Sequence, residues 1–375
     1  PHSTLNLMVI APFRAFLQSL TSEEVRNATR TAADGFPPIS RGFSVAEERV
    51  GQNSAPALYS YDHRSRGCRI CGVIALIGPE GAHFRSPMPA HPDAVAFARQ
   101  QFGSKRQQFA PVLALYEAEP LPKLEAAFQQ ADANEDQLRI DPVADPQVLS
   151  ELSSAVNDLP LTVIAGQEWL EAANGHPVMV LLINQRTCTP ERNALHCTVR
   201  WKPGWHAGDM VRLGREHFFF HDISRFMPQV DGTGPHYLGT AVAEHLLPKI
   251  PGENVYIAVT ARHTFRIHSL PGWSDTVLAH RSPEERCISA LQLHEILIPD
   301  ALELRPETAN AQVSYTGNMD EAVTRVIRGD ADVAFLMNAP SVQQIVAVAH
   351  TGGSIPPHSF RLRLEPVPGA ITYAF

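Results

Sequence analysis

The amino-acid sequence predicts an α/β (α+β) fold with a mixed sheet, and three observations support that expectation. Apolar runs of strand length alternate with amphipathic helical segments over residues 313–349. Residues 161–173 combine an apolar strand, a glycine and a helix in direct succession. The composition, 44% hydrophobic and 19% charged over 375 residues, is that of a globular chain of two to three domains.

The first 120 residues are expected to contain two helices and three strands. Ser22 is a candidate helix cap because acidic residues follow it in the first turn. In order, we expect a helix over Ser22–Thr31, a proline-rich loop over Asp34–Pro38, strands over Ala57–Asp62 and Cys71–Ile77 joined by the polar turn His63–Gly67, a helix over Pro92–Phe102 ending at Gly103, and a strand over Pro111–Tyr116.

The middle of the chain holds the most informative local pattern. Residues 118–158 are rich in Ala, Asp, Gln and Glu, which predicts an exposed helical connection. A strand beginning at Leu161 then meets Gly166 and turns into a helix that Asn174-Gly175 ends, and a central strand follows over Pro177–Asn184. Residues 185–240 are dense in His, Arg, Gly and Trp, and we expect them to be irregular.

The last third of the chain is regular. We expect a strand over Val313–Tyr315, a helix over Asp320–Arg328 capped by Asn318, a strand over Asp332–Met337 and a helix over Ser341–Ala349. Such an alternation predicts a layered sheet with right-handed crossovers.

Five segments follow from these elements. Residues 1–7 precede the first methionine, and we expect them to be an addition to the natural chain. The others are an N-terminal αβ region (8–120), a linker helix with the strand-turn-helix (121–184), an irregular region (185–280), and a helix with the β-α-β-α region that completes the fold (281–375).

Charge and hydropathy narrow the classes of partner. The net charge is −8 at pH 7 and the isoelectric point is about 6.1, so we expect no nucleic-acid partner. No apolar run approaches the roughly 20 residues that span a bilayer, and we expect no membrane partner. Five scattered cysteines do not make a disulfide framework, and we expect a cytoplasmic protein.

Three motifs suggest chemistry but have plainer explanations. Cys68 and Cys71 form a Cys-x-x-Cys, yet they lie in an apolar strand pattern without a second ligand pair, so we expect a structural role. His217 and His221 have the spacing of a two-His metal site, but no third ligand is identifiable, so we predict neither metal nor cofactor. For His294-Glu295 we expect a structural His–Glu hydrogen bond rather than a catalytic base.

Several segments resemble, in order, the bacterial and archaeal family catalogued as domain of unknown function 1015. The segments are Pro12-Phe13-Arg14 for its "PFR", Phe36-Pro37-Pro38-Ile39-Ser40 for "APPYD", Leu58 to Asp62 with Gly72 to Leu76 for "YxYE…RRGIIGLV", His83 to Ser86 for "HERT", Ala110 to Tyr116 for "SPIFGLY", Leu293 to Leu297 for "VLHELIL", and Asp330 to Ser359 for "FLLNPTPVEQVLAVADAGEVMPPKST". The resemblance covers nearly the whole chain and is poorest over 185–280.

The family's central strand-turn-helix, "IADGHHRYEAA", falls on Val163–Ala173, which is also similar to the "IAGERRWRAA" of ParB proteins. ParB, sulfiredoxin and free-serine kinases share this arrangement, so the resemblance implies a ParB/sulfiredoxin-like centre. A glycine lets backbone approach a phosphate, and a helix N-terminus presents unpaired N–H groups. By this resemblance a small anion would bind over Gly166 to Glu168.

The departures from the family pattern affect the implied activity. Ala165 replaces the family's Asp, Gln167-Glu168-Trp169 replaces His-His-Arg, and His358 replaces the lysine of "PPKST". Phosphoryl transfer needs a carboxylate for base or metal duty, which Ala165 cannot supply. The kinase activity of the family therefore cannot be carried over.

We predict a biosynthetic enzyme of small-molecule metabolism, specialised metabolism included, that acts on an amino-acid-like substrate carrying a phosphate or sulfate, by leaving-group elimination or internal displacement. Its candidate catalytic residues are Glu168, His83 and Glu171, and its candidate substrate- and anion-binding residues are Gly166, Gln167, Arg14, Arg85, Tyr61, His358 and Ser359.

Alternatives remain open at this point. One is a non-catalytic pseudoenzyme in a homo- or hetero-oligomer, with Trp169, Trp201, Trp205 and Trp273 as interface anchors, although core packing is the better expectation for each Trp taken singly. Others are a small-molecule kinase and a nucleic-acid-binding ParB-like protein. Tyr59 and Tyr61 alternate along one strand face, where packing and substrate contact are both reasonable.

Overall fold

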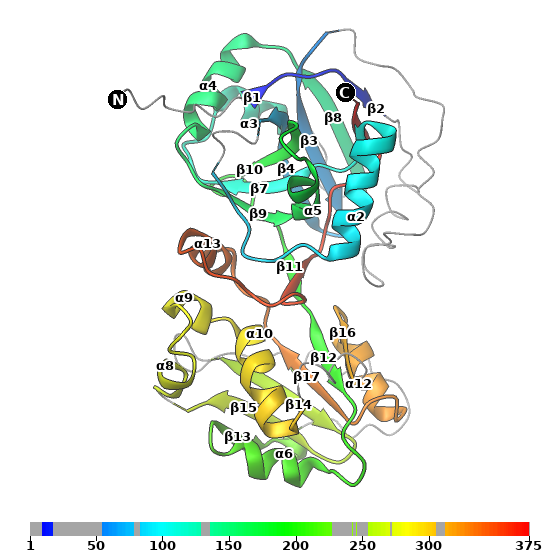
Figure 1. Cartoon of the computed structure of the whole chain (residues 1–375), viewed down its shortest axis with the longest axis vertical. Helices are drawn as coiled ribbons and strands as arrows, with labels where there is room; N and C mark the ends of the chain where they lie inside the picture. Colours follow the sequence, from blue (N-terminus) through cyan, green and yellow to red (C-terminus); the bar gives the residue numbers. More distant parts are fainter. Residues whose placement is uncertain are drawn as a thin grey trace. The chain divides into compact units, whose positions relative to one another are not determined.

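The computed structural model describes residues 10–17, 55–78, 83–128, 136–226, 242, 245, 254–270, 272–304 and 312–374. It divides into two compact units, Pro1–Glu191 with Leu362–Phe375 (unit 1) and Arg192–Arg361 (unit 2), shown in Figure 1. The units cut across the five segments expected from sequence. The helix and loop expected over 22–38 lie outside the described residues.

Unit 1 contains an eight-stranded mixed sheet. Its strands, in spatial order, are β5 (Phe84–Arg85), β9 (Leu161–Ala165), β7 (Val112–Tyr116), β10 (Val178–Asn184), β4 (Cys68–Ile77), β3 (Leu58–Ser65) and β8 (Gln137–Val143), with β1 (Ile10–Ala11) paired to β4. β5 with β9 and β7 with β10 run parallel, and the other pairs are antiparallel. The mixed sheet expected from the sequence is confirmed.

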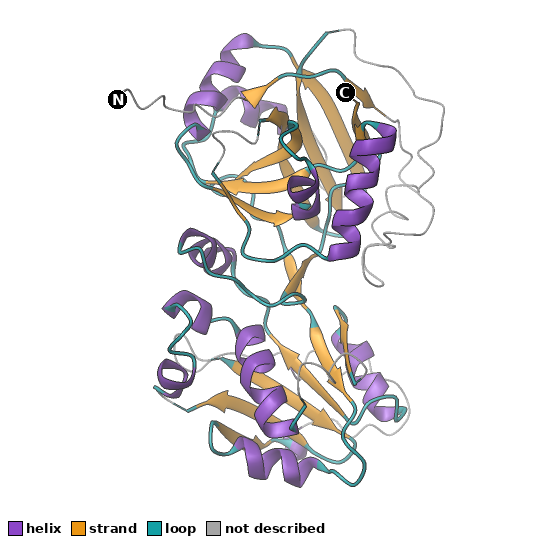
Figure 2. Cartoon of the chain, viewed as in Figure 1, coloured by secondary structure: helices purple, strands orange, loops and turns teal. Residues whose placement is uncertain are grey.

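The helices of unit 1 pack on this sheet (Figure 2). They are α2 (Pro92–Gln100) with its π-helical continuation η1 (Gln101–Lys105), α3 (Pro122–Phe128), α4 (Pro146–Val156) and α5 (Gln167–Ala172). Trp169 of α5 is buried against Phe102 and Phe109, with ring centroids 5.7 and 5.1 Å away. Trp169 is therefore a core residue and not an exposed anchor.

The C-terminal segment completes unit 1 by covering one face of β3. Its strand β19 (Ile371–Ala374) pairs with β2 (Ala15–Leu17) and β6 (Gln107–Gln108). The Tyr59 hydroxyl donates to the Phe13 carbonyl at 3.1 Å and accepts the Ala15 N–H at 3.0 Å. The Tyr61 hydroxyl accepts the Val367 N–H at 3.0 Å. Tyr59 therefore holds the N-terminal segment against the sheet, and Tyr61 holds the C-terminal segment.

Unit 2 contains a six-stranded sheet and a two-stranded ribbon. The sheet order is β13 (Phe218–Asp222), β15 (Thr264–Ser269), β14 (Val255–Thr260), β17 (Val333–Met337), β12 (His196–Val199) and β16 (Val313–Thr316); β11 (Arg192–Ala194) pairs with β18 (Phe360–Leu362). Because β12 is antiparallel to both neighbours, β16 and β17 run parallel. The helix α12 (Met319–Ile327) joins them, which confirms the expected β-α-β unit.

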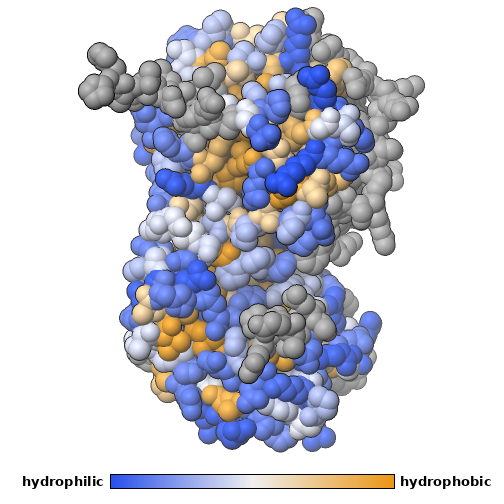
Figure 3. All heavy atoms as spheres, in the orientation of Figure 1, coloured by the Kyte–Doolittle hydropathy of each residue, from blue (hydrophilic) through white to orange (hydrophobic). Residues whose placement is uncertain are grey.

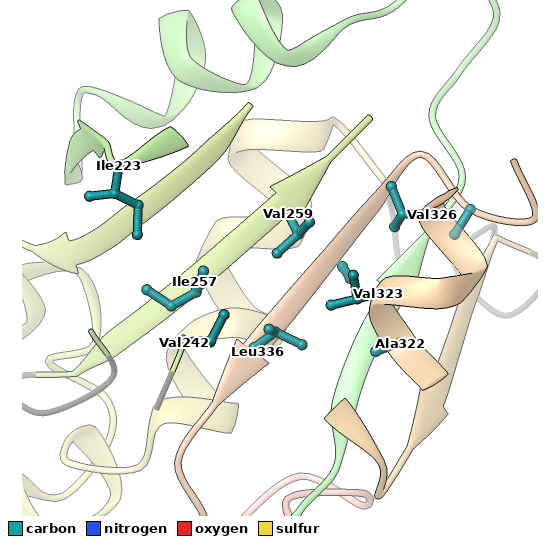
Figure 4. Packing of buried hydrophobic residues seen from close by; sticks show 10 residues of the cluster. Ile223, Val242, Ile257, Val259, Ala322, Val323, Val326 and Leu336 are labelled. Carbon is teal, nitrogen blue, oxygen red and sulfur yellow. The ribbon is translucent and has the colours of Figure 1, made fainter. Parts of the chain in front are cut away.

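The helix α12 buries its apolar face on the sheet of unit 2 (Figure 4). Ala322, Val323 and Val326 pack with Ile257 of β14 and Leu336 of β17 in one buried cluster. The remaining helices of unit 2 are α6 (Ala207–Gly214), the short 3₁₀ turn η2 (Ser224–Phe226), α8 (Trp273–Val277), α9 (Pro283–Arg286), α10 (Ser289–Gln292), the π-helical η4 (Leu293–Ala301) and α13 (Val342–His350). Hydrophilic residues predominate on the face of each unit that Figure 3 displays.

Four local expectations were wrong. The region 118–158 contains a strand, β8, because an edge strand can carry polar residues on its open side. β3 extends to Ser65, so the turn shortens to Arg66 and Gly67, both with positive φ. The helix after residue 92 passes Gly103 as a π-helical turn. The region 185–240, expected to be irregular, contains β11, β12, α6 and β13.

One buried group predicts acid sensitivity of unit 1. His63 lies fully buried on β3, and neither ring nitrogen makes a hydrogen bond of good geometry. Burial lowers the pKa of His63 from 6.5 to about 4, although the nearby Glu365 backbone and the charges of Asp62 and Asp136 favour the protonated form. Stability present above pH 6.5 is therefore lost as the pH falls towards 4.

We expect His63→Phe to remove this loss, which amounts to about 3 kcal/mol at most, because phenylalanine fills the site without a titrating group. Urea unfolding of both proteins between pH 7 and pH 4.5 measures it. His176→Gln, at an exposed position, is the control. Equal pH dependence in wild type and His63→Phe would contradict the assignment.

Candidate functional site

The turn between β9 and α5 has the strand-turn-helix order that the sequence predicts. β9 ends at Ala165, Gly166 adopts φ 79° and ψ 17°, and α5 begins at Gln167. The helix ends before Asn174 and Gly175, whose φ angles are 45° and 88°. These left-handed positions bound a single short helix at the end of a buried strand.

Gly166 is required by packing as well as by its φ angle. A Cβ atom there would lie 2.9 Å from the Val112 Cα and 3.2 Å from the Pro111 carbonyl oxygen. The start of β7 therefore fills the space that the missing side chain leaves. On that side of the turn the glycine admits a neighbouring strand and leaves no space for an anion.

The amide groups of the turn are partly occupied by the chain itself. The Glu168 carboxylate is stabilised by its own backbone N–H, and the Trp169 N–H donates to the Gly166 carbonyl at 3.0 Å. An anion over Gly166 to Glu168 would have to displace the Glu168 carboxylate from the Glu168 N–H. The turn thus offers fewer unpaired N–H groups than the sequence suggests.

The charge at the turn is acidic. Burial raises the pKa of Glu168 above its usual 4.5, and the nearby carboxylates of Glu365 and Glu171 raise it further, while its own N–H opposes this shift. Glu168 and Glu171, three residues apart on α5, share one side of the helix. An oxyanion would meet repulsion here, whereas an ammonium group would be attracted.

His83 and Arg85 lie towards the other end of β9. The His83 carbonyl accepts the Leu161 N–H at 2.9 Å, and Arg85 is paired with Thr162. At about 3.3 Å per residue, Leu161 and Gly166 are about 16 Å apart along the strand. The structure therefore brings Glu168 and Glu171 together but sets His83 apart from them.

Arg14 and Tyr61 belong to the region where the chain ends meet the sheet. Arg14 is exposed between Phe13, which bridges to Ala57, and Ala15. Tyr61 is fully buried, and burial raises the pKa of its hydroxyl. Since this hydroxyl already accepts the Val367 N–H, the packing interpretation accounts for Tyr61.

His358 and Ser359 belong to unit 2. The Ser359 hydroxyl is buried and donates to the Pro356 carbonyl at 2.6 Å. His358 has φ 69° and its ring stacks on Tyr315, with centroids 4.6 Å apart. Tyr315 also contacts His294, whose pKa is lowered to about 4, mainly by burial and then by the charge of His358. This aromatic cluster carried no signal in the sequence.

The other motifs have structural partners. His217 lies 3.3 Å from the Asp300 carboxylate and under Trp273, and His221 stacks on His268. In the described part of the chain, no group of three or more His, Cys, Asp or Glu residues could hold a metal ion. The expected His294–Glu295 hydrogen bond was wrong, because Glu295 pairs with Arg281 and His280 instead.

Glu365 is the group near Glu168 that sequence reasoning missed. It lies between Leu364 and Pro366 in the segment that returns to unit 1, about two hundred residues after Glu168 in the sequence. No motif surrounds it. Only the return of the C-terminal segment to the first unit brings this carboxylate near the turn.

Comparisons with known proteins assign no family. No family model and no curated protein matches the chain, so the resemblance to the domain of unknown function 1015 family stays a prediction. Among solved structures, a free serine kinase in complex with AMP matches at 10% identity and TM-score 0.38, covering 78% of this chain and 88% of that one. SbnI from Staphylococcus aureus, truncated at its C-terminus, matches at 13% identity and TM-score 0.40, covering 79% of this chain and 88% of that one.

A conserved hypothetical protein from Pyrococcus furiosus matches at 9% identity and TM-score 0.38, covering 78% of this chain and 91% of that one. At these values the likeness assigns no activity to this chain. Within the described ranges, no helix is both long and apolar enough to cross a membrane.

Replacing Gly166 tests the packing of the turn. We expect Gly166→Ala to destabilise unit 1 by about 3 kcal/mol, since it combines left-handed strain with overlap against β7. Gly175→Ala is the matched control: its φ is also positive but nothing lies within 4 Å of an added Cβ. It should lose only about 1 kcal/mol in urea unfolding. Equal losses would contradict the close approach of β7.

Replacing Glu168 tests the electrostatics. Because its pKa is raised, stability present below pH 4.5 is lost as the pH rises through the folded-state pKa. We expect Glu168→Gln to raise Tm at pH 7 to 8 and to change it little at pH 4. Thermal unfolding at both pH values measures this, with Glu171→Gln, at an exposed position, expected to shift less. A larger gain at pH 4 than at pH 8 would contradict the assignment.

Proposed function

We propose that this chain is an enzyme of small-molecule metabolism that acts on an amino-acid-like substrate carrying a phosphate or sulfate. The reaction is elimination of that group or its displacement by an amine of the same substrate. Glu168 is the acid–base group. The observation that supports this proposal is a carboxyl group of raised pKa at the end of a buried strand, beside two further carboxylates.

The raised pKa makes the Glu168 carboxylate a stronger base than that of an ordinary glutamate. A stronger base takes a proton from substrate more readily, and the protonated carboxyl group can return it. In the elimination, Glu168 takes the proton from the carbon next to the substrate carboxylate. The electrons of that bond form the double bond, and the carbon–oxygen bond to phosphate or sulfate breaks.

The acidic turn also suits an amino group. Glu171 and Glu365 carry negative charge near Glu168, which attracts the ammonium group of an amino-acid-like substrate. The oxyacid group would then lie away from the turn. Arg85 on β5 pairs with Thr162, four residues before Gly166 on β9, so this exposed cation lies too far along the strand to contact the oxyacid group of a small substrate bound at Glu168.

The test uses O-phospho-L-serine and O-sulfo-L-serine as probes, with release of phosphate or sulfate as the readout. We expect Glu168→Gln to lower kcat by about 100-fold or more, with its pH profile flattened, as for loss of a general base. The control is Glu151→Gln on α4, a partly exposed carboxylate outside the proposed site. Full turnover in Glu168→Gln would remove Glu168 from the mechanism.

A non-catalytic subunit is the second candidate. The observation that favours it is the occupation of the turn by the chain itself, through Val112 against Gly166 and the Glu168 carboxylate on its own N–H. In this case neither probe is turned over with or without ATP and Mg²⁺. Turnover that depends on ATP would instead favour the small-molecule kinase alternative.

A further inference from the structure

Two buried cysteines of unit 1 lie in direct contact. Cys71 is on β4, and Cys188 follows β10 after a short turn. The Cys71 N–H donates to the Cys188 sulfur at 3.3 Å, and the Cys188 sulfur lies 3.7 Å from the Arg69 carbonyl oxygen. Only 3% of Cys71 and 7% of Cys188 is exposed. The two thiols are also hydrogen-bonded to each other.

The surroundings distinguish the two thiols. The hydrogen bond from the Cys71 thiol lowers the pKa of Cys188, and the Cys71 N–H and the Arg69 guanidinium lower it further, against burial and the charge of Asp62. The same thiol–thiol bond raises the pKa of Cys71. Arg69 is held in place by Asp62 through two contacts of 2.9 Å. Cys188 is therefore the more nucleophilic partner.

Cys68, the other half of the Cys-x-x-Cys, does not share this environment. It is three residues from Cys71 on the same strand, so its side chain points to the opposite face of the sheet. Its sulfur lies 3.5 Å from the Glu191 carboxylate, and burial and that carboxylate raise the pKa of its thiol, while Arg363 opposes the shift. The contact pair is Cys71 with Cys188, which are 117 positions apart in sequence.

We propose that Cys71 and Cys188 are a reversible oxidation site that closes to an intramolecular disulfide. With hydrogen peroxide as oxidant, the Cys188 thiolate attacks one peroxide oxygen, the O–O bond breaks, and hydroxide leaves to give a sulfenic acid. The Cys71 thiol then attacks that sulfur, the S–O bond breaks and water leaves. In total, two thiols and one peroxide give one disulfide and two waters.

The disulfide would tie β4 to the segment through which the chain leaves unit 1. Cys188 lies just before Arg192, the first residue of unit 2. Because Cys71 and Cys188 are 117 positions apart, a disulfide between them would close a long loop and strongly restrict the unfolded chain. We therefore expect the oxidised protein to melt about 5 °C or more above the reduced protein. A thiol reductant should reverse the change.

The experiment treats the full-length wild-type protein with hydrogen peroxide, blocks the remaining thiols and maps the peptides by mass spectrometry. We expect a Cys71–Cys188 linked peptide, with two thiols lost per chain, and recovery of both thiols on reduction. Cys188→Ser should abolish the linkage and Cys68→Ser should retain it. Peptide mapping of the wild type needs no variant, so a folding defect in Cys188→Ser leaves the test intact.

Other outcomes overturn the proposal. A Cys68–Cys71 linkage would show that the sequence motif and not the contact pair reacts. Oxidation of Cys188 to sulfinic acid with Cys71 still reduced would show that the second step does not occur. No change at either cysteine after peroxide treatment would show that the pair is purely structural.

Discussion

The position of Glu168 depends on one backbone constraint, the close approach of Gly166 to the start of β7. Only a residue without a Cβ fits at this left-handed position, because an added Cβ would lie 2.9 Å from the Val112 Cα. This conformation ends β9 and starts α5 at once, so Glu168 falls on the first turn of the helix. On the same helix Trp169 enters the aromatic core with Phe102 and Phe109, which fixes the helix on the sheet. Glu168 is thereby held at a partly buried place.

The sequence was most informative where local patterns decide structure. The strand, glycine and helix from Leu161 onwards, the central strand β10 and the β-α-β unit around α12 all rest on short-range periodicity and capping, such as Asn318 accepting the Asp320 N–H. The strand β8 was missed because its exposed residues read as a polar connection, and its partner β3 lies far away in sequence. Pairing of that kind is a tertiary effect that no local pattern encodes.

The candidate site likewise combines features that the local sequence predicts with features that only the tertiary structure shows. A glycine at a strand end has two uses, approach to a ligand or approach to another strand, and the sequence cannot distinguish them. In the structure, Pro111 and Val112 lie against Gly166, so on one side of the turn the glycine admits another strand and not a ligand. The acidic character of the turn depends on Glu365, which reaches unit 1 only through the returning C-terminal segment. The hydroxyl of Tyr61 is occupied by that same segment, at Val367, and this too could not be foreseen.

The proposed chemistry depends on the Glu168 carboxyl group keeping its proton to a higher pH than an ordinary glutamate. Carbon-13 NMR of the glutamate carboxyl carbons, titrated with pH and assigned by comparison with Glu168→Gln, measures this most directly. We expect the Glu168 resonance to titrate above the ordinary 4.5. A midpoint at or below 4.5 would show that burial and the neighbouring carboxylates do not govern the pKa of Glu168.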